Sequence, residues 1–281
     1  MNHHGATNAL VRRIVWVATL AVAFLLAPGQ HPALALLLLA LGVPHGAADQ
    51  LLHLATARTH HRTTRVFAAY YVLALGAYTL LWYYFPILAL LGFVLLSVYH
   101  FGQTRGGTIP DQLIWGAFYL GFPILVHYGE ARPIVEGIIG QSLQLPGWLP
   151  RTGAVVLAVL AALNAHLRNS RELWMDLGVL LCLYLSTDLL LGFAVYFLLW
   201  HSLPASLDQY AFVRDRLSGG QLRAYLRQLL PVTLAGLACL ALAYALLFAR
   251  SDTAPLFSRI FVMISLITLP HAVLVDRIYR S

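Results

Sequence analysis

Long apolar segments, separated by short polar stretches, run along almost the whole chain. A membrane-spanning helix needs roughly 20 predominantly apolar residues, within a range of about 17–25. Ten segments approach that length. They are residues 11–27, 33–56, 66–85, 87–104, 112–128, 152–167, 172–187, 191–206, 229–249 and 257–278. The pattern predicts an all-α protein, a polytopic transmembrane bundle of about ten helices, with residues 1–281 forming a single integral-membrane domain.

Two places along the chain decide the helix count. Residues 172–206 form one long apolar stretch, which Asp188 divides into two crossings; without that division there would be nine helices. The first apolar run, residues 14–27, follows two arginines, as the core of a signal peptide would. Because no A-x-A cleavage pattern precedes Pro28, we interpret this run as a membrane helix, with a cleaved signal as the alternative.

The composition agrees with a membrane protein. The chain is 60% hydrophobic and 10% charged, whereas a soluble domain has about 25% charged residues. All 18 cationic residues are arginines, and they are spread between the apolar segments, so the net charge of +7 does not indicate a nucleic-acid partner. Cys182 and Cys239 lie within apolar runs, which predicts neither a disulfide nor a CxxC-type metal site.

The arginines also predict the orientation of the helices. Ten helices that begin in the cytoplasm place fourteen arginines on the cytoplasmic side and four on the outer side. The cytoplasmic set is Arg12, Arg13, Arg58, Arg62, Arg65, Arg105, Arg168, Arg171, Arg214, Arg216, Arg223, Arg227, Arg277 and Arg280, and the outer set is Arg132, Arg151, Arg250 and Arg259. Cytoplasmic loops carry an excess of arginine and lysine, so we expect both termini in the cytoplasm. The expected location is the cell inner (plasma) membrane, in contact with its lipid bilayer.

Two predicted loops are longer than the others. Residues 129–151 should lie outside and include a short interfacial helix that ends at Pro146. Residues 207–228 are basic, and their leucines have the spacing of an amphipathic helix that lies on the anionic inner leaflet.

The stretch from Gly42 to Asp49, GVPHGAAD, interrupts the second apolar segment. Pro44 cannot donate a helical hydrogen bond, and Gly42 and Gly46 permit close backbone approach. His45 and Asp49 are one helical turn apart and should face the same side. Because a histidine and a carboxylate are costly at membrane depth unless they have partners, we expect other polar residues to meet His45.

Four of the twelve histidines lie well inside predicted membrane helices: His45, His100, His201 and His271. Each is 10 to 14 residues from the proposed outer end of a different helix, counting 33 to 45, 87 to 100, 191 to 201 and 257 to 271. At a rise of about 1.5 Å per residue this spread is roughly 6 Å of depth, much of which helix tilt could absorb. Four helices can therefore bring four imidazoles to one level.

A metal ion would satisfy all four imidazoles at once. A single buried histidine usually makes an interhelical hydrogen bond, but four at one depth with few acidic partners are harder to satisfy. Neutral imidazole binds iron, copper, zinc or nickel. Asp49 could accept a hydrogen bond that fixes the tautomer of one histidine, or could only hold two helices together. The aromatic neighbours Tyr99, Phe101 and Trp200 are usual as lipid contacts or core, but beside a metal they would suit a long, flat, apolar substrate.

Four stretches, taken in order, resemble the Brp/Blh family of bacterial and archaeal β-carotene 15,15′-dioxygenases. They are GVPHGAAD, Tyr99-His100-Phe101-Gly102, Trp200-His201-Ser202 and Leu269-Pro270-His271. The resemblance spans nearly the whole chain. It implies an integral membrane enzyme with non-haem Fe(II), which splits the central double bond of β-carotene with O₂ into two retinals. By position, His45, His100 and His201 correspond to histidines that bind iron in the family.

One position departs from the family's pattern. The fourth residue after His201, where the family has a second histidine, is Ala205. His271 could supply the fourth ligand instead, so the expected metal-binding and catalytic set is His45, His100, His201 and His271. The departure leaves open a divergent histidine-metal membrane oxygenase that acts on another carotenoid or on an apolar lipid.

Two function classes other than an oxygenase stay open. Four membrane histidines could ligate two b-type haems, although such ligands usually occur as pairs on the same helices at two depths. A proton relay between histidine and aspartate would fit a transporter, although no inverted repeat is evident. A Soret band would identify a haem protein. A protein without metal and without O₂ consumption would fit a transporter. Membrane di-iron hydroxylases and desaturases need HxxxH or HxxHH clusters, which the sequence lacks.

Overall fold

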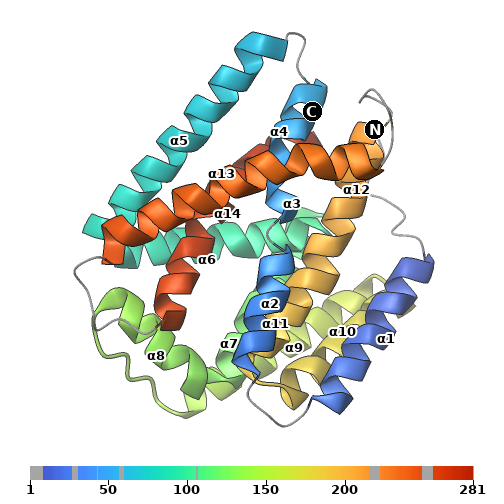
Figure 1. The fold of residues 1–281 in the computed structure, drawn as a ribbon. Coiled ribbons are helices and arrows are strands. Elements are labelled where there is room, and N and C mark those ends of the chain that lie inside the picture. Colours follow the sequence, from blue (N-terminus) through green and yellow to red (C-terminus); the bar gives the residue numbers. More distant parts are fainter. Residues whose placement is uncertain are drawn as a thin grey trace. The chain divides into compact units, whose positions relative to one another are not determined.

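A computed structural model describes residues 9–26, 31–42, 44–56, 60–105, 107–214, 222–248 and 256–280. This part of the chain consists of helices and their connections and holds no strand (Figure 1), which confirms the predicted all-α class. A helix satisfies its backbone hydrogen bonds internally, so apolar segments of this length can contact lipid along their sides.

Within the described residues, each of the ten predicted apolar segments is largely helical. The elements are α1 (Ala9–Leu25), α2 (Pro32–Gly42), α3 (Pro44–Ala47), α4 (Asp49–Thr56), α5 (His60–Tyr84), α6 (Pro86–Gln103), α7 (Ile109–Val126), α8 (Tyr128–Ile139), α9 (Trp148–Leu167), α10 (Arg171–Ser186), α11 (Leu189–Val195), the π-helix η1 (Tyr196–Ser202), α12 (Leu203–Arg214), α13 (Leu222–Phe248) and α14 (Leu256–Arg280).

The predicted helix at residues 33–56 is interrupted within GVPHGAAD. The first part, α2, ends at Gly42, the single turn α3 follows, and α4 begins at Asp49 after a turn at Ala48. Pro32–His53 is nevertheless one stretch long and apolar enough to cross a membrane, which agrees with the single crossing predicted for this segment.

Two other predicted boundaries can be compared with the structure. Asp188 does separate α10 from α11: its carboxylate accepts a hydrogen bond of 2.8 Å from the backbone N–H of Leu191, which caps α11. The helix expected within residues 129–151 exists as α8, but it ends at Ile139 and not at Pro146. The reason is Gly140, whose φ of 67° lies in the left-handed region and ends a helix.

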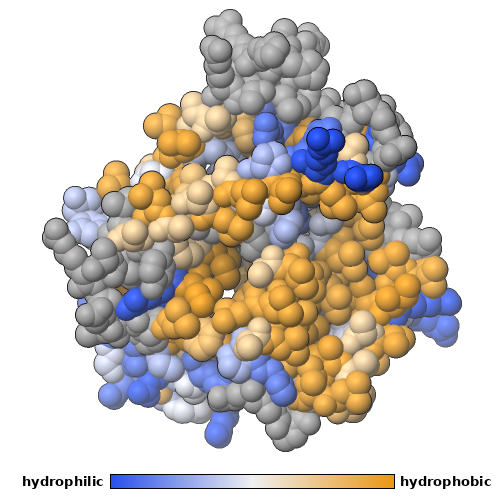
Figure 2. All heavy atoms as spheres, in the orientation of Figure 1, coloured by the Kyte–Doolittle hydropathy of each residue, from blue (hydrophilic) through white to orange (hydrophobic). Residues whose placement is uncertain are grey.

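Within the described residues, seven stretches are long and apolar enough to cross a membrane. They are Pro32–His53, Val66–Tyr84, Pro86–Gln103, Ile109–Val126, Trp148–Leu167, Leu189–Arg214 and Leu256–Val273. These coincide with seven of the ten predicted crossings, and the crossings assigned to α1, α10 and α13 stay predictions. Apolar side chains lie along much of α13 in Figure 2. Leu226, Leu230 and Leu234 of this helix are each more than half exposed. Such a surface suits contact with lipid.

The chain divides into two compact units that alternate along the sequence. The first comprises Met1–Gly42, Ser97–Arg132 and Leu143–Pro204, and the second comprises Val43–Leu96, Pro133–Ser142 and Ala205–Ser281. Because the units alternate, no single cut in the chain separates them. The expectation of one integral-membrane domain stays a prediction.

The first unit has an aromatic core. Trp115, Phe118 and Tyr119 of α7 pack with Tyr184 of α10 and Tyr196 of η1, and each of these side chains is at most 1% exposed. Helix α7 also lies along α9. Large aromatic side chains bury much apolar area each, so this cluster holds α7, α10 and η1 together.

Two glycines bring the last turns of α6 against α7 in the same unit. A Cβ atom on Gly102 would collide with the backbone carbonyl of Gln112, and one on Gly116 would collide with that of Val98. Only glycine permits this backbone contact. Because His100 lies within the same turns of α6, the contact also positions His100.

A buried ion pair ties the end of α6 to α10. The guanidinium of Arg105 pairs with Asp176 and donates to the hydroxyl of Tyr119, and its carbon lies 4.8 Å from the ring centroid of Trp115. Burial acts to lower the pKa of Arg105, but Tyr119 and Asp176 outweigh it and raise that pKa above its usual value. Arg105 is therefore charged, and its charge is compensated.

In the second unit α14 contacts α3, α4, α5 and α13. One apolar cluster joins α5, α6 and α14 through Tyr78, Trp82, Phe93 and Leu266. A second apolar cluster forms between the residues just after His45 and the first turns of α13. It includes Ala48 and Leu51 on one side and Tyr225 and Leu229 on the other. These two clusters hold α3 and α4 beside α14.

Candidate functional site

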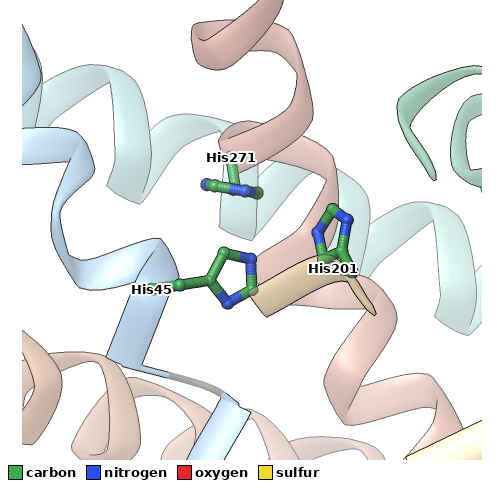
Figure 3. Close-up of side chains that lie close together, drawn as sticks. All are labelled: His45, His201 and His271. Atoms are coloured by element: carbon green, nitrogen blue, oxygen red, sulfur yellow. The ribbon is translucent and has the colours of Figure 1, made fainter. Parts of the chain in front are cut away.

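His45 and His271 meet within the second unit. His45 lies on the single turn α3, directly after Pro44, and His271 lies on α14, directly after Pro270. Their ring centroids are 4.9 Å apart with the rings perpendicular, and Figure 3 shows the two imidazoles close together. His45 is 7% exposed and His271 is 6% exposed. Two helices that are far apart in sequence thus bring two buried imidazoles into contact.

Asp49 is the hydrogen-bond partner of His271. The Nδ1 atom of His271 lies 2.9 Å from both carboxylate oxygens of Asp49, which is 1% exposed. The hydroxyl of Tyr71, on α5, donates to Oδ2 of the same carboxylate. In the tautomer that carries its proton on Nδ1, toward Asp49, the lone pair of the His271 ring is on Nε2.

The other two candidate histidines meet within the first unit. His100 on α6 is 4% exposed and His201 on η1 is 2% exposed. Their ring centroids are 5.0 Å apart at an interplanar angle of 74°. Nδ1 of His100 lies 3.3 Å from Oε1 of Gln103, three residues further along α6. The side-chain carbonyl of Gln103 can therefore accept a hydrogen bond from Nδ1–H of His100, as the Asp49 carboxylate can from Nδ1–H of His271.

Aromatic rings enclose His201. The ring of Phe101 lies 4.5 Å from that of His201, edge to face, and the ring of Phe197 stacks on it at 5.8 Å with an interplanar angle of 23°. Phe197 and His201 are four residues apart on one helix, which places them on the same face. The rings make the surroundings of His201 apolar.

His201 lies on a π-helix, drawn in Figure 3 as the segment that carries it. The backbone N–H of Leu203 reaches the carbonyl of Leu198, five residues back, as in π-helical pairing. Pro204 follows directly and has no N–H for the carbonyl of Trp200. Single π-turns inside α-helices occur frequently at functional sites.

Gly42 supports the π-helix within the first unit. Its carbonyl accepts a hydrogen bond of 2.8 Å from the hydroxyl of Ser202. A Cβ atom at Gly42 would collide with the ring of Phe197. The first residue of GVPHGAAD thus helps to hold the helix that carries His201.

The remaining predicted residues occupy different positions. Tyr99 is half-buried on α6, next to His100. The indole N–H of Trp200 donates 2.9 Å to the hydroxyl of Thr19 on α1, so that edge of the ring is directed at α1. Ala205 is half-buried on α12. The roles of Tyr99, Phe101 and Trp200 in a substrate pocket stay predictions.

Sequence reasoning did not identify Tyr71, Gln103, Phe197 or the role of Gly42 toward Phe197. The spacing of Gln103 from His100 and of Phe197 from His201 is a local signal that could have found both. Tyr71 has no such signal, because its contact with Asp49 joins two separate helices.

Comparison with known proteins places the chain in a family. Residues 36–279 match the family described as BCD, beta-carotene 15,15'-dioxygenase. A curated relative, the beta-carotene 15,15'-dioxygenase of Uncultured marine bacterium 66A03, is 34% identical over 77 residues, which cover 27% of this chain and 28% of the relative. No solved structure matches the chain. Because the family match extends over most of the sequence, including all four candidate histidines, the chain belongs to the beta-carotene 15,15'-dioxygenase family.

Proposed function

We propose that this protein cleaves the central 15,15′ double bond of β-carotene with O₂ and releases two molecules of retinal. The observation that carries the proposal is the set of four buried histidines, arranged as one contacting pair in each unit, in a chain of this family. We propose further that His45, His100, His201 and His271 together hold one non-haem Fe(II).

The donors fit such a metal. Iron accepts neutral imidazole, and metal-binding histidines nearly always give their other ring N–H to a carboxylate, a carbonyl or water. His271 has this arrangement with Asp49, and His100 has it with the side-chain carbonyl of Gln103. His271 would thereby serve as the fourth ligand, for which the family has a histidine at the position of Ala205. Bound Fe(II) would supply the activation of O₂.

The protein's own residues would position the substrate and exclude water. All four histidines are at most 7% exposed, so water has little access to them. The rings of Phe101 and Phe197 beside His201 offer flat apolar surface to a polyene. β-Carotene is about as long as the hydrocarbon core of a bilayer is thick, so it would reach the protein sideways from lipid.

The packing of each pair disfavours the haem alternative. The two imidazoles of a pair contact each other edge to face, which leaves no space for a porphyrin between them. A purified protein with a Soret band would nevertheless establish that class and contradict the proposal.

Expression in a host that makes β-carotene tests the reaction. We expect bleaching and retinal formation with the natural sequence, and loss of both when any one of His45, His100, His201 or His271 is changed to alanine. His166→Ala is the matched control, because His166 is exposed at the end of α9 and should leave retinal formation unchanged. Products of another length would point to a divergent member of the family with a different cleavage position.

Metal analysis of the purified protein tests the site separately. We expect about one iron per chain, and loss of that iron when both His45 and His100 are changed to alanine. Full iron occupancy in this double variant would contradict the four-histidine site.

A further inference from the structure

We infer that Tyr71 is a positioning residue for the candidate metal site: it orients Asp49, and Asp49 in turn sets the ring of His271. The inference rests on the proposed four-histidine site and adds a residue that neither the family match nor the local sequence assigns. The three side chains come from α5, α4 and α14, all within the second unit.

The geometry gives each group a defined part. Both oxygens of Asp49 lie 2.9 Å from Nδ1 of His271, so either oxygen could accept the hydrogen bond from the imidazole N–H. The hydroxyl of Tyr71 donates to Oδ2. This second hydrogen bond fixes the rotation of the carboxylate and occupies a lone pair that would otherwise be unsatisfied at 1% exposure.

Rotation of the carboxylate matters because it decides the tautomer of His271. While Asp49 faces Nδ1, the proton stays on Nδ1 and Nε2 has a lone pair for a metal. If the carboxylate turns away, the proton can move to Nε2, and His271 then loses the lone pair on that side. Tyr71 therefore acts on the metal through two other residues and needs no contact with it.

Aromatic packing holds Tyr71 in place for this task. Its ring lies 4.8 Å from that of Phe67, one turn earlier on α5, and the Phe67 ring lies 5.2 Å from the imidazole of His53 on α4. Ring contacts among His53, Phe67 and Tyr71 thus join α4 to α5. Removing only the hydroxyl should leave this packing intact.

The test compares Tyr71→Phe with Tyr78→Phe in the purified full-length protein. Tyr78 is a matched control on the same helix: it is 4% exposed and its hydroxyl donates 3.0 Å to the carbonyl of Ala89, but it does not contact Asp49. We expect Tyr71→Phe to weaken retention of Fe(II) against a chelator about tenfold, the lower end of what outer partners of metal ligands contribute. Tyr78→Phe should leave retention unchanged.

A double-mutant cycle separates positioning from general stability. Because Tyr71 acts through Asp49, adding Tyr71→Phe to Asp49→Asn should cause no further loss of Fe(II) retention. Additive losses, or a Tyr71→Phe variant that retains iron as the natural protein does, would overturn the inference.

A second readout does not depend on metal. In metal-free protein labelled with ¹⁵N at histidine, the signals that disappear in His271→Gln belong to His271. We expect them to report a proton on Nδ1 in the natural protein and a mixture of tautomers in Tyr71→Phe. If the natural protein binds no iron, the proposed function fails, while this comparison still decides whether Tyr71 sets the tautomer. Identical His271 signals in the natural protein and in Tyr71→Phe would refute the proposal that Tyr71 sets the tautomer.

Discussion

At the scale of single residues, His271 and His100 differ in the group that lies within hydrogen-bond distance of Nδ1. Asp49 offers a carboxylate to His271, and Gln103 offers a neutral amide oxygen to His100. A carboxylate forms the stronger, charge-assisted hydrogen bond. It also makes the imidazole more basic and so a better ligand for a metal. The carboxylate therefore supports the ring of His271 more strongly than the amide supports the ring of His100.

Gly42 gives a prediction at this scale. Gly42→Ala should lower the free energy of unfolding by about 1–3 kcal/mol, because the added methyl would overlap the ring of Phe197 in a packed interior. Thermal or denaturant unfolding in detergent measures this. Gly76→Ala is the control: its Cβ would have nothing within 4 Å, and alanine forms helix better by about 1 kcal/mol.

The collision at Gly42 has a specific remedy. Phe197→Leu should restore part of the stability in the Gly42→Ala background, since a smaller side chain leaves room for the methyl. If Gly42→Ala were as stable as Gly76→Ala, the close packing of α2 on the π-helix would be contradicted.

At the scale of elements, three of the four candidate histidines lie where a helix is irregular. His45 lies on a single turn that begins with Pro44, His201 on a π-helix followed by Pro204, and His271 after a proline inside α14. Each of these prolines has no N–H to donate, so the carbonyl four residues earlier lacks its usual helical partner.

Pro204→Ala tests the π-helix. The new N–H at residue 204 could donate to the carbonyl of Trp200, so the segment could become α-helical and turn His201 away from its present direction. We expect unchanged or higher thermal stability and about a hundredfold slower retinal formation, the size of effect that a displacement of about 1 Å can cause.

The control for this change is Pro231→Ala, which removes an exposed proline inside α13 and should leave the rate unchanged. A Pro204→Ala variant that keeps the full rate would show that the π-helix has no part in the activity.

At the scale of the whole molecule, the arginine distribution predicts the topology. In a Cys182→Ser, Cys239→Ser background, Ser142→Cys should react with a membrane-impermeant maleimide on intact cells, because residue 142 lies in a predicted outer loop. Ser218→Cys should react only after the membrane is permeabilised. Labelling of both variants on intact cells would contradict ten crossings with cytoplasmic termini.

Much of the fold could be predicted because its signals are local. Hydropathy located every long helix, and Asp188 marked a boundary that a capping hydrogen bond explains. The start of α4 was harder to predict, because the turn at Ala48 has no signal of its own within GVPHGAAD. The end of α8 depends on a left-handed Gly140, which the sequence does not distinguish from the other glycines.

The candidate site could be predicted only in part. The expected depth of each histidine follows from its distance to a predicted helix end, and this gives the prediction that the four lie at one level. Which histidines contact each other within a unit depends on which helix faces pack together. No repeating pattern in the sequence reports that packing. Tyr71 shows the limit, because nothing near it in the sequence relates it to Asp49 or His271.

The separation of Asp49 and His271 has a consequence for biosynthesis. They are 222 residues apart, and α14 is the last helix that the structure describes. A ribosome therefore releases the segment with Asp49 into the membrane long before its imidazole partner is made. Tyr71 follows Asp49 by only 22 residues and is made far earlier. During synthesis Tyr71 is thus the first of the two partners that the carboxylate can meet, and it can keep that buried group hydrogen-bonded until α14 arrives.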